Sequence, residues 1–388
     1  METTLIDFSG SAYSADRTTA VVGIGNTAYG NFPELSPYDL GASALRAALD
    51  DSGLKLSDID GLVVHRIPNY QRFCELVGLN PTFVTGLAGQ GRMSGTSIHL
   101  AAMAIKQGAA RNVALVYGNN GRSAGDKYGG VADRYGSDGA KLWFPYGMTS
   151  PGAVHAMMFQ RHMHLYGTTS EQLAAVAVAC RNHALLNPNA VMKKPITAED
   201  HRTAPWIVEP LHLLDYCMIN DGGVAMILTS IDRARDLPQP VIRIKGIAQA
   251  TAMTHSTFPP EDFWHAPLSQ AGTKSLHQAG IGREDVDGLM IYDNFSPTVL
   301  FSLEGLGYCP AGESGAWVQD GRIELGGEYP LNTSGGHLSE SYMQGWALNI
   351  EAVRQLRGQA GARQITGARH IHYACASPIV SSIIYGLD

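Results

Sequence analysis

The segment Ser52-Gly-Leu-Lys-Leu-Ser-Asp-Ile-Asp-Gly-Leu-Val-Val64 aligns without a gap with Ala279-Gly-Ile-Gly-Arg-Glu-Asp-Val-Asp-Gly-Leu-Met-Ile291. Each copy predicts a helix that ends at glycine, a short loop with an acidic cap, a turn at Asp-Gly and then a buried strand. Asp-x-Asp-Gly alone is common by chance, but here the flanking residues agree as well. The chain is therefore predicted to contain two copies of one α/β unit.

Further apolar segments flank each copy in the same order. Thr19-Ala-Val-Val-Gly-Ile24 precedes the first copy and Val241-Ile-Arg-Ile-Lys-Gly246 precedes the second, while Arg111-Asn-Val-Ala-Leu-Val-Tyr117 resembles Arg369-His-Ile-His-Tyr-Ala374 further downstream. A polar, proline-bearing linker near Asp232–Pro240 joins the halves. We therefore predict an N-terminal half over residues 1–235, with an insertion at about 120–230, and a C-terminal half over residues 236–388.

The insertion has one clear helical signal. Thr168-Thr-Ser-Glu171 predicts a capping box, an alanine-rich apolar stretch follows from Leu173 to Leu186, and Asn187-Pro188 ends it. The preceding segment Asp126–Gly152 is rich in Gly, Tyr and Asp and is predicted to be a loop. A substrate lid, a dimer contact and an ordinary surface excursion all remain open for it.

Composition narrows the functional classes. The 388 residues are 45% hydrophobic and 16% charged, with no apolar run long enough to span a bilayer. The N-terminal residues lack the pattern of a signal peptide, so a cytoplasmic protein is expected. The net charge is −7 and no Lys/Arg cluster is present, so neither nucleic acid nor a membrane surface is expected as a partner.

Cysteine and histidine patterns give no metal site. The five cysteines are widely spaced and none forms Cys-x-x-Cys, so neither a disulfide framework nor a zinc site is predicted. His162-Met-His164 and His370-Ile-His372 have the spacing of one face of a strand, but acids are missing nearby. Asp221-Gly-Gly223 is predicted to be a turn between two apolar strands.

Tyr292-Asp-Asn-Phe295 follows a predicted buried strand and begins a helix-like stretch. Residues at the carboxyl end of a strand in an α/β layer face the usual ligand crevice, so Tyr292 is a candidate site residue. Simple packing of the tyrosine ring is the alternative. Asp293 is placed to cap the following helix.

Asn332-Thr-Ser-Gly-Gly-His-Leu-Ser-Glu-Ser-Tyr342 is the more specific signal. Gly335-Gly336 lets the backbone approach a ligand and can turn amide N–H groups toward an oxyanion, with His337 beside it. Tyr342 is predicted to begin a helix whose N-terminal field favours a phenolate or a developing enolate. A glycine-rich turn with capping side chains is the alternative.

Two further positions are candidates to line the same pocket. Ser94-Gly-Thr-Ser97 opens an alanine-rich helix, and N-capping explains Ser94 better than a nucleophilic role because Gly-x-Ser-x-Gly is absent. Cys375 lies after the last predicted strand, where its thiol is able to reach a pocket. Cys217 is predicted to be a buried, unreactive cysteine.

Taken together these segments resemble the thiolase superfamily, in its sterol-carrier-protein-X/lipid-transfer-protein-like branch. The likeness extends over nearly the whole chain and is greatest to the thiolase-like aldolases of bacterial steroid side-chain degradation. Tyr292 stands where thiolases have the asparagine of Asn-Glu-Ala-Phe, and Tyr342 stands at the histidine of Gly-His-Pro. Gly91-Arg-Met-Ser-Gly95, which matches the nucleophile loop, has no cysteine. The resemblance implies an α/β thiolase fold of two βαβαβαββ halves in a five-layer αβαβα sandwich, and a homodimer.

The resemblance also implies a function. Without the nucleophilic thiol no acyl-enzyme forms by the usual route, so thiolysis is not expected. In the aldolase branch the proposed acid/base pair corresponds to Tyr292 and Tyr342. That branch also pairs with a small zinc-ribbon/OB-fold protein, itself often tied to an enoyl-CoA hydratase. Coenzyme A is implied as part of the substrate, with no other cofactor and no metal.

The expected reaction is retro-aldol cleavage of a β-hydroxyacyl-CoA, such as a steroid side-chain ester, to a ketone or aldehyde plus acetyl- or propionyl-CoA. Tyr292 is assigned to the β-hydroxyl side and Tyr342 to the enolate side. A tyrosine has an ordinary pKa of about 10, so the site is expected to lower that value or to relay the proton. The expected supporting residues are His337, Asp293, Glu340 and Asn332, and the expected oxyanion and substrate-binding residues are Gly335, Gly336, Ser94, Gly95 and Cys375.

Two other classes remain open on sequence grounds. A degenerate thiolase or acyltransferase would use Cys375 or Cys217 as its nucleophile and would need an acceptor such as free coenzyme A. A non-catalytic subunit would bind an acyl-CoA or lipid without turnover and would tolerate the loss of both tyrosines.

Overall fold

The computed structural model describes residues 19–88, 93–127, 151–254 and 259–388. The elements from the first strand to the end of the first half are β1 (Thr19–Asn26), α1 (Pro37–Ser52), β2 (Gly61–His65), α2 (Tyr70–Val77), β3 (Phe83–Leu87), α3 (Met93–Lys106), β4 (Asn112–Asn120), α4 (Pro151–Tyr166), α5 (Ser170–Leu185), α6 (Ala198–Thr203), β5 (Trp206–Val208), β6 (Leu211–His212), β7 (Asp221–Ser230) and α7 (Ile231–Ala234).

The second half follows and has fewer inserted elements. Its elements are β8 (Ile242–Thr251), α8 (His265–Ala279), β9 (Gly288–Ile291), α9 (Ser296–Gly305), α10 (Ser314–Trp317), α11 (Gly336–Ser339), α12 (Trp346–Leu356), β10 (His370–Cys375) and β11 (Ile379–Leu387). Cys375 therefore ends β10, and β11 still follows it, whereas the sequence had predicted no strand after Cys375.

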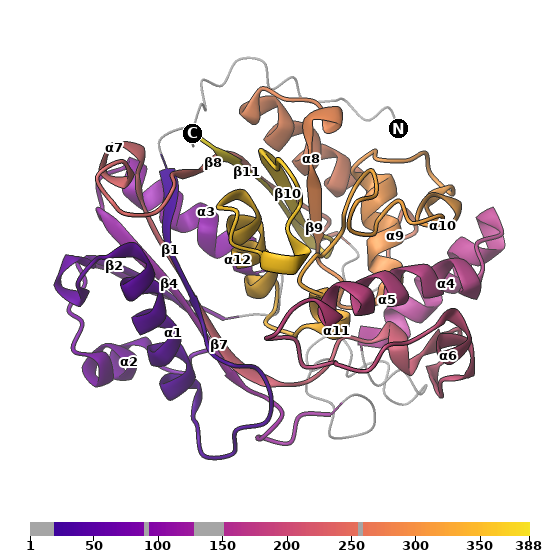
Figure 1. Ribbon diagram of the computed structural model, residues 1–388, viewed down its shortest axis with the longest axis horizontal. Helices are drawn as coiled ribbons and strands as arrows, with labels where there is room; N and C mark the ends of the chain where they lie inside the picture. The colour runs from indigo at the N-terminus through magenta and orange to yellow at the C-terminus, as the bar shows by residue number, and fades with distance from the viewer. Residues whose placement is uncertain (1–18, 89–92, 128–150, 255–258) are drawn as a thin grey trace.

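The strands join in the order β3-β2-β4-β7-β1-β8-β11-β10-β9. Strands β2, β4, β7 and β1 have the same order from the outside inward as β9, β10, β11 and β8. The halves meet where β1 pairs with β8 through only two residue pairs, Ala20 with Arg243 and Val21 with Ile242. This short junction lets the two half-sheets lie as separate layers (Figure 1).

Helices complete five layers. Helix α1 packs on β1, β4 and β7, and α8 packs on β8 and β11, so each covers the outer face of its half-sheet. Helices α3 and α12 contact strands of both halves and form the middle layer (Figure 1). Alternate residues of β1 show that both sheet faces are buried: Val21 joins the central core, while Ala20 and Val22 join the outer one. The five-layer architecture expected from the resemblance is confirmed.

The Asp-x-Asp-Gly repeat has a physical explanation. The Asp60 Oδ1 accepts the backbone N–H groups of Arg111 and Asn112, both at 2.8 Å. In the second copy the Asp287 Oδ2 accepts those of Arg369 and His370, at 2.7 and 2.9 Å. Each aspartate thus ties the start of one parallel strand to the start of its neighbour. The domain boundary near residue 235 remains a prediction.

The insertion is more structured than one helix. Helices α4, α5 and α6 and the β5–β6 hairpin all lie between β4 and β7. Helix α5 is present as predicted, but its capping box is shifted by one residue, with Thr169 as N-cap and Gln172 at its third position. Residues 128–150, most of the predicted loop, lie outside the described residues.

Three local predictions were wrong. His162 and His164 lie on helix α4 and not on a strand. Asp221 begins β7, where its carboxylate accepts the backbone N–H groups of Phe32, Arg122 and Ser123 and so joins three segments. Tyr342 lies in the loop before α12, whose N-cap is Gly345. No helix in the described part of the chain is long and apolar enough to cross a membrane.

Candidate active site

Two tyrosines meet in the interior. Tyr292 directly follows β9, and Tyr342 lies in the loop between α11 and α12. Their hydroxyl oxygens are 2.8 Å apart, and the residues are only 4% and 7% exposed. Either oxygen is able to donate the shared hydrogen bond. A pair of adjacent phenols that share one hydrogen bond provides a path for a proton.

The backbone at Tyr292 is held on both sides. The Asn332 side chain accepts the Ile291 N–H and donates to the Ile291 carbonyl, both at 2.8 Å. The Tyr292 N–H donates to the carbonyl of Ala374 at 2.8 Å, which continues the pairing of β9 with β10. Asn332 is thus a supporting residue that fixes where the strand ends, because its amide replaces a neighbouring strand there.

Asp293 and His337 form a buried pair beside the phenols. The Asp293 carboxylate accepts the backbone N–H groups of His337 at 2.9 Å and Leu338 at 3.3 Å, so it caps α11 and not α9 as predicted. The His337 Nε2 accepts the Gly345 N–H at 2.9 Å, and its Nδ1 lies 3.0 Å from the Asp293 Oδ1, outside hydrogen-bond geometry. Both ring nitrogens therefore face groups other than the phenols.

The His337 ring instead contacts the faces and edges of both tyrosines. Its centroid is 4.6 Å from that of Tyr292 and 5.2 Å from that of Tyr342, both in edge-on arrangements. Such contacts fix ring orientation. The geometry makes His337 a spacer between the two tyrosines, which differs from the relay that the sequence suggested.

The surroundings of Tyr292 change its pKa in the direction opposite to one of the two alternatives expected from the sequence. Burial raises the pKa of Tyr292 well above its ordinary value, and the Tyr342 phenol and the Cys375 thiol raise the pKa further, as does Cys217. The expectation that the site lowers this tyrosine's pKa was wrong. The physical cause is that a phenolate here would lose its hydration without gaining a cation. Tyr292 is therefore protonated at neutral pH.

The glycine pair is required by packing. Gly335 and Gly336 have φ values of +107° and +60°, which favour glycine. A Cβ on Gly336 would lie 2.1 Å from the Asp293 carboxylate, and one on Gly335 would lie 2.6 Å from the Ala184 Cβ. The Gly335 N–H already donates to the Asn332 carbonyl at 2.8 Å, so it is not available to hold an enolate oxygen.

The start of α3 lies on another side of Tyr292. The Ser94 hydroxyl is 2.9 Å from the Tyr373 hydroxyl. A Cβ on Gly345 would lie 2.5 Å from the Tyr373 hydroxyl, 2.6 Å from the Ser94 hydroxyl and 3.3 Å from the Tyr292 ring. Ser94 therefore shares its surroundings with Tyr292, while Gly95 packs against Ser381. Arg92, the position that matches the thiolase nucleophile, lies outside the described residues.

Two thiols complete the surroundings. Cys375 and Cys217 are buried and close enough to Tyr292 to affect its pKa, and none of the five cysteines forms a disulfide. The prediction that Cys217 is buried is confirmed, and its lack of reactivity stays a prediction. Within the described ranges, no three His, Cys, Asp or Glu side chains gather as metal ligands would.

Glu340 is also buried but faces a different cluster. Its Oε1 accepts the Asn187 Nδ2 at 3.0 Å. Burial and the Glu351 carboxylate raise the pKa of Glu340 to about 7. The sequence suggested that Glu340 helps to lower the tyrosine pKa or to relay the proton. In the structure its carboxyl instead lies among Tyr29, Ser334 and Glu351.

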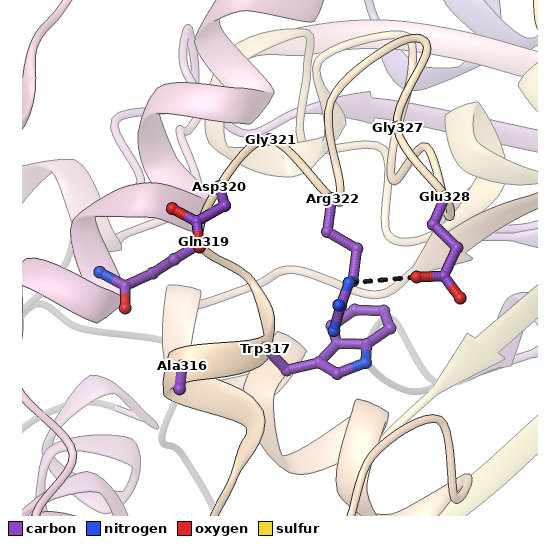
Figure 2. A pocket seen from close by; sticks show the side chains of 8 residues that line it. All are labelled: Ala316, Trp317, Gln319, Asp320, Gly321, Arg322, Gly327 and Glu328. Atoms are coloured by element: carbon purple, nitrogen blue, oxygen red, sulfur yellow. Dashed lines mark ion pairs between the residues drawn. The ribbon is translucent and has the colours of Figure 1, made fainter.

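A surface pocket of about 220 Å³ lies in the loop segment 316–328, and none of the predicted site residues lines it. Within it the Arg322 guanidinium stacks over the Trp317 ring at 5.1 Å, and its Nε is 3.1 Å from the Glu328 Oε2 (Figure 2). This arrangement is an exposed ion pair on an aromatic ring, which contributes little stability and no reacting group.

Comparison with known proteins shows which family the chain belongs to. Residues 250–379 match the family described as Thiolase C-terminal domain-like. A steroid side-chain-cleaving aldolase from Thermomonospora curvata is 39% identical over 354 residues, which are 87% of this chain and 90% of the relative. A 17-hydroxy-3-oxo-4-pregnene-20-carboxyl-CoA lyase from Mycobacterium tuberculosis is 36% identical over 378 residues, which are 94% of this chain and 97% of the relative.

Solved structures give the same result. The Ltp2-ChsH2(DUF35) aldolase matches with a TM-score of 0.88 and 35% identity, covering 97% of this chain and 99% of that chain. Human mitochondrial 3-ketoacyl-CoA thiolase matches with a TM-score of 0.71 at 15% identity, covering 96% and 99%, which shows the fold alone. The chain belongs to the thiolase superfamily, in the branch of thiolase-like aldolases that contains its steroid side-chain-cleaving relatives.

Proposed function

We propose that this protein is a carbon–carbon lyase that cleaves a β-hydroxyacyl-CoA by a retro-aldol reaction at Tyr292 and Tyr342. The observation that carries the proposal is the 2.8 Å contact between the two buried phenol oxygens. The products are a ketone or aldehyde and a shorter acyl-CoA. The reaction moves one proton from the β-hydroxyl to the α-carbon, so it needs a proton path and no redox partner.

The phenol pair provides that path without a free phenolate. As the Cα–Cβ bond breaks, the β-hydroxyl proton passes to the Tyr342 oxygen while the Tyr342 proton passes to Tyr292. In the same concerted transfer the original Tyr292 proton passes to the α-carbon, so neither phenol gains a net charge. Because burial keeps Tyr292 protonated, it suits the donor end of this relay. This order is the reverse of the one expected from the sequence.

The remaining site residues assist this chemistry. Backbone N–H groups at Ser94 and Gly95, in the first turn of α3, are the proposed donors to the enolate oxygen, because the field at a helix N-terminus favours a developing negative charge. Gly336 packs against Asp293, and Cys375 lies near Tyr292. Coenzyme A enters as part of the substrate, and no other cofactor is proposed.

The substrate class follows the relatives. Both relatives with 36–39% identity bear names of steroid side-chain or pregnene-carboxyl-CoA cleavage. A steroid side-chain CoA ester is therefore the proposed substrate, with acetyl- or propionyl-CoA as the thioester product. The expected cytoplasmic location agrees with such a substrate and remains a prediction.

A partner protein is part of the proposal. The solved aldolase with a TM-score of 0.88 is named with a DUF35 component, ChsH2. We expect this chain to associate with a small zinc-ribbon/OB-fold partner of that kind, which is itself associated with an enoyl-CoA hydratase. A hydratase makes β-hydroxyacyl-CoA esters, the class that this site would cleave.

A homodimer is proposed through the sheet edge. Strand β3 ends the nine-stranded sheet and pairs on one side only, with β2, in the described part of the chain. Its Val84 side chain is exposed. An exposed edge strand is able to pair with a second copy around a two-fold axis. A Val84→Pro variant, which removes an N–H on the edge that faces away from β2, should shift the purified protein to a monomer in sedimentation velocity, and an unchanged mass would remove this edge from the interface.

The test of the function is a product assay. The purified chain, with and without a co-encoded zinc-ribbon partner, is incubated with a steroid side-chain β-hydroxyacyl-CoA and no free coenzyme A. Release of acetyl- or propionyl-CoA with an equal amount of ketone or aldehyde supports the lyase. Release that requires added free coenzyme A would instead support acyl transfer, and binding without any product would support a lipid-binding subunit.

A further inference from the structure

The insertion makes several hydrogen bonds to the loop that carries Tyr342. Arg181 of α5 donates from its Nε to the Ser339 hydroxyl at 2.9 Å. After α5 ends, the Val191 N–H donates to the Glu340 carbonyl at 2.9 Å and the Met192 N–H donates to the Ser339 carbonyl at 3.1 Å. These residues are far from the loop in sequence, so the insertion serves as its scaffold.

Asn187 makes the most specific of these contacts. It is 2% exposed, and its Nδ2 donates both to the Ser334 carbonyl at 2.9 Å and to the Glu340 Oε1 at 3.0 Å. Its Oδ1 accepts the Asn189 N–H at 3.1 Å. Both amide hydrogens and the amide oxygen are thus engaged, which fixes the side-chain orientation. One side chain therefore joins the two ends of the turn over residues 334–340.

Glu340 is an unusual acceptor for that amide. It is 1% exposed, and its carboxyl lies beside the Ser334 hydroxyl and near Tyr29. The charged groups that face Glu340 are Glu351, Arg354 and Arg363.

Burial disfavours the ionised form of Glu340, and the Glu351 carboxylate adds to this, whereas Arg354 and the hydrogen bond from Asn187 oppose it. The Arg363 guanidinium donates to both oxygens of the Glu351 carboxylate at 2.9 Å, so this ion pair lies beside Glu340. Burial, and then the Glu351 carboxylate, raise the pKa of Glu340 from the usual 4.5 to about 7.

We propose that the Asn187–Glu340 contact is a proton-dependent positioning device: with Glu340 protonated, the insertion holds residues 334–342 so that Tyr342 meets Tyr292. Ionisation of Glu340 places a second negative charge opposite Glu351 in a buried space. The loop then opens more often, because exposure to water relieves that repulsion. The catalytic consequence rests on the function proposed above, whereas the effect on the loop does not.

Hydrogen exchange tests the loop directly. Amide protection of the peptide over residues 334–345 is measured at pH 6 and pH 8 and corrected for intrinsic exchange rates. Wild-type protection should fall at pH 8, and Glu340→Gln should abolish that fall because the amide cannot ionise. Asn187→Ala should lower protection at both values by about tenfold, as expected for the loss of buried hydrogen bonds.

The matched control is Asn182 on helix α5, which ends just before Asn187. The Asn182 Nδ2 reaches only the Glu324 carboxylate at 3.5 Å, so Asn182→Ala removes the same kind of side chain without touching the loop. Equal protection in the Asn187 and Asn182 variants would overturn the proposal. So would a Glu340→Gln protein that keeps the wild-type fall in protection between pH 6 and pH 8. Glu340→Gln preserves size and an acceptor, so it decides the matter even where Asn187→Ala fails to fold.

Turnover supplies the second readout. In the product assay, Asn187→Ala should lower kcat about tenfold with little change in KM, because Tyr342 is misplaced while the substrate site remains. Glu340→Gln should retain turnover at pH 8 better than wild type does. If wild type cleaves nothing, the proposed function fails, and hydrogen exchange still decides the positioning device. If hydrogen exchange changes as expected but kcat does not, the Asn187–Glu340 contact holds the loop without contributing to the chemistry of the tyrosine pair.

Discussion

The two copies of the repeat place different side chains at equivalent strand ends. Strand β2 ends at His65, and in the aligned second copy the same position is Tyr292. The His65 Nδ1 accepts the Trp346 Nε1–H at 2.9 Å, which secures α12 to the first half. Tyr292 instead meets Tyr342. One backbone plan thus supports a packing contact in one half and the candidate chemistry in the other.

The difference arises from the segments that lead into the two middle-layer helices. Before α3 the first half has only a short connection that contains no acidic residue, Ala88-Gly-Gln-Gly-Arg92. Before α12 the second half has the long segment 332–345, which brings Tyr342, His337 and Glu340. The insertion from the first half then packs on this segment. The repeat supplies the scaffold, and its departures from symmetry supply the site.

The largest expected effect distinguishes Tyr292, at the end of β9, from His65, at the end of β2. Tyr292→Phe and Tyr342→Phe should each lower kcat by roughly 100-fold or more, the range for general acid–base groups, while the protein stays folded. His65→Phe removes one buried hydrogen bond, so it should cost about 1 kcal/mol of stability and leave turnover within a few-fold of wild type. Steady-state kinetics and thermal unfolding of the three variants check this. A Tyr→Phe variant with normal turnover would exclude that tyrosine from the mechanism.

The free energy of unfolding should depend on pH through Glu340, a buried acid that only the second half has. The raised pKa of Glu340 means that the unfolded chain loses this proton near pH 4.5 and the folded chain near pH 7. The folded state binds more protons between these values, so stability falls as pH rises from about 4.5 to about 7. This term amounts to about 3 kcal/mol at most.

Glu340→Gln should remove that decline. Its free energy of unfolding, measured by urea titration at pH 5, 6, 7 and 8, should fall less over this range than that of wild type. Glu351→Gln is not a suitable control because Glu351 pairs with Arg363. Glu324→Gln, at a part-buried carboxyl near Asn182, should keep the wild-type decline. Parallel curves for wild type and Glu340→Gln would contradict the assignment.

The shared part of the repeat should respond equally in both halves. Asp60→Ala and Asp287→Ala each remove two charge-assisted hydrogen bonds to backbone N–H groups at the start of the neighbouring strand. Each should cost about 2 kcal/mol in the free energy of unfolding, checked by urea titration at one pH. Clearly unequal losses would mean that the repeat is alike in sequence but not in energetics.

The smallest effect should come from the thiol beside Tyr292. In the aligned repeat Cys375 occupies the place of Tyr117, and the retro-aldol path assigns no chemistry to its sulfur. Cys375→Ala should therefore cause only a small loss of turnover, through looser packing at Tyr292. Acyl transfer with Cys375 as nucleophile requires complete loss. Product release from this variant distinguishes the two reactions.

Much of the fold derives from local patterns in the sequence. The aligned Asp-x-Asp-Gly segments, the apolar strands around them and helix α5 all occur as predicted, because periodicity, caps and turns depend on neighbouring residues. Local pattern marked both tyrosines as candidates, and the resemblance to a family then paired them as acid and base. Local patterns failed where long-range contacts decide: the helical His162 and His164, Asp221 within a strand, and Tyr342 before its helix.

The sequence by itself determined the repeated architecture and the identity of the two phenols. Only the tertiary structure decided that their oxygens lie 2.8 Å apart, that Asp293 caps α11, and that the His337 Nε2 is occupied by a backbone N–H. It also decided the direction of the Tyr292 pKa, which rises because the ring is buried among neutral groups. Burial and contacts between distant segments depend on the packed chain as a whole, and no local pattern of residues encodes them.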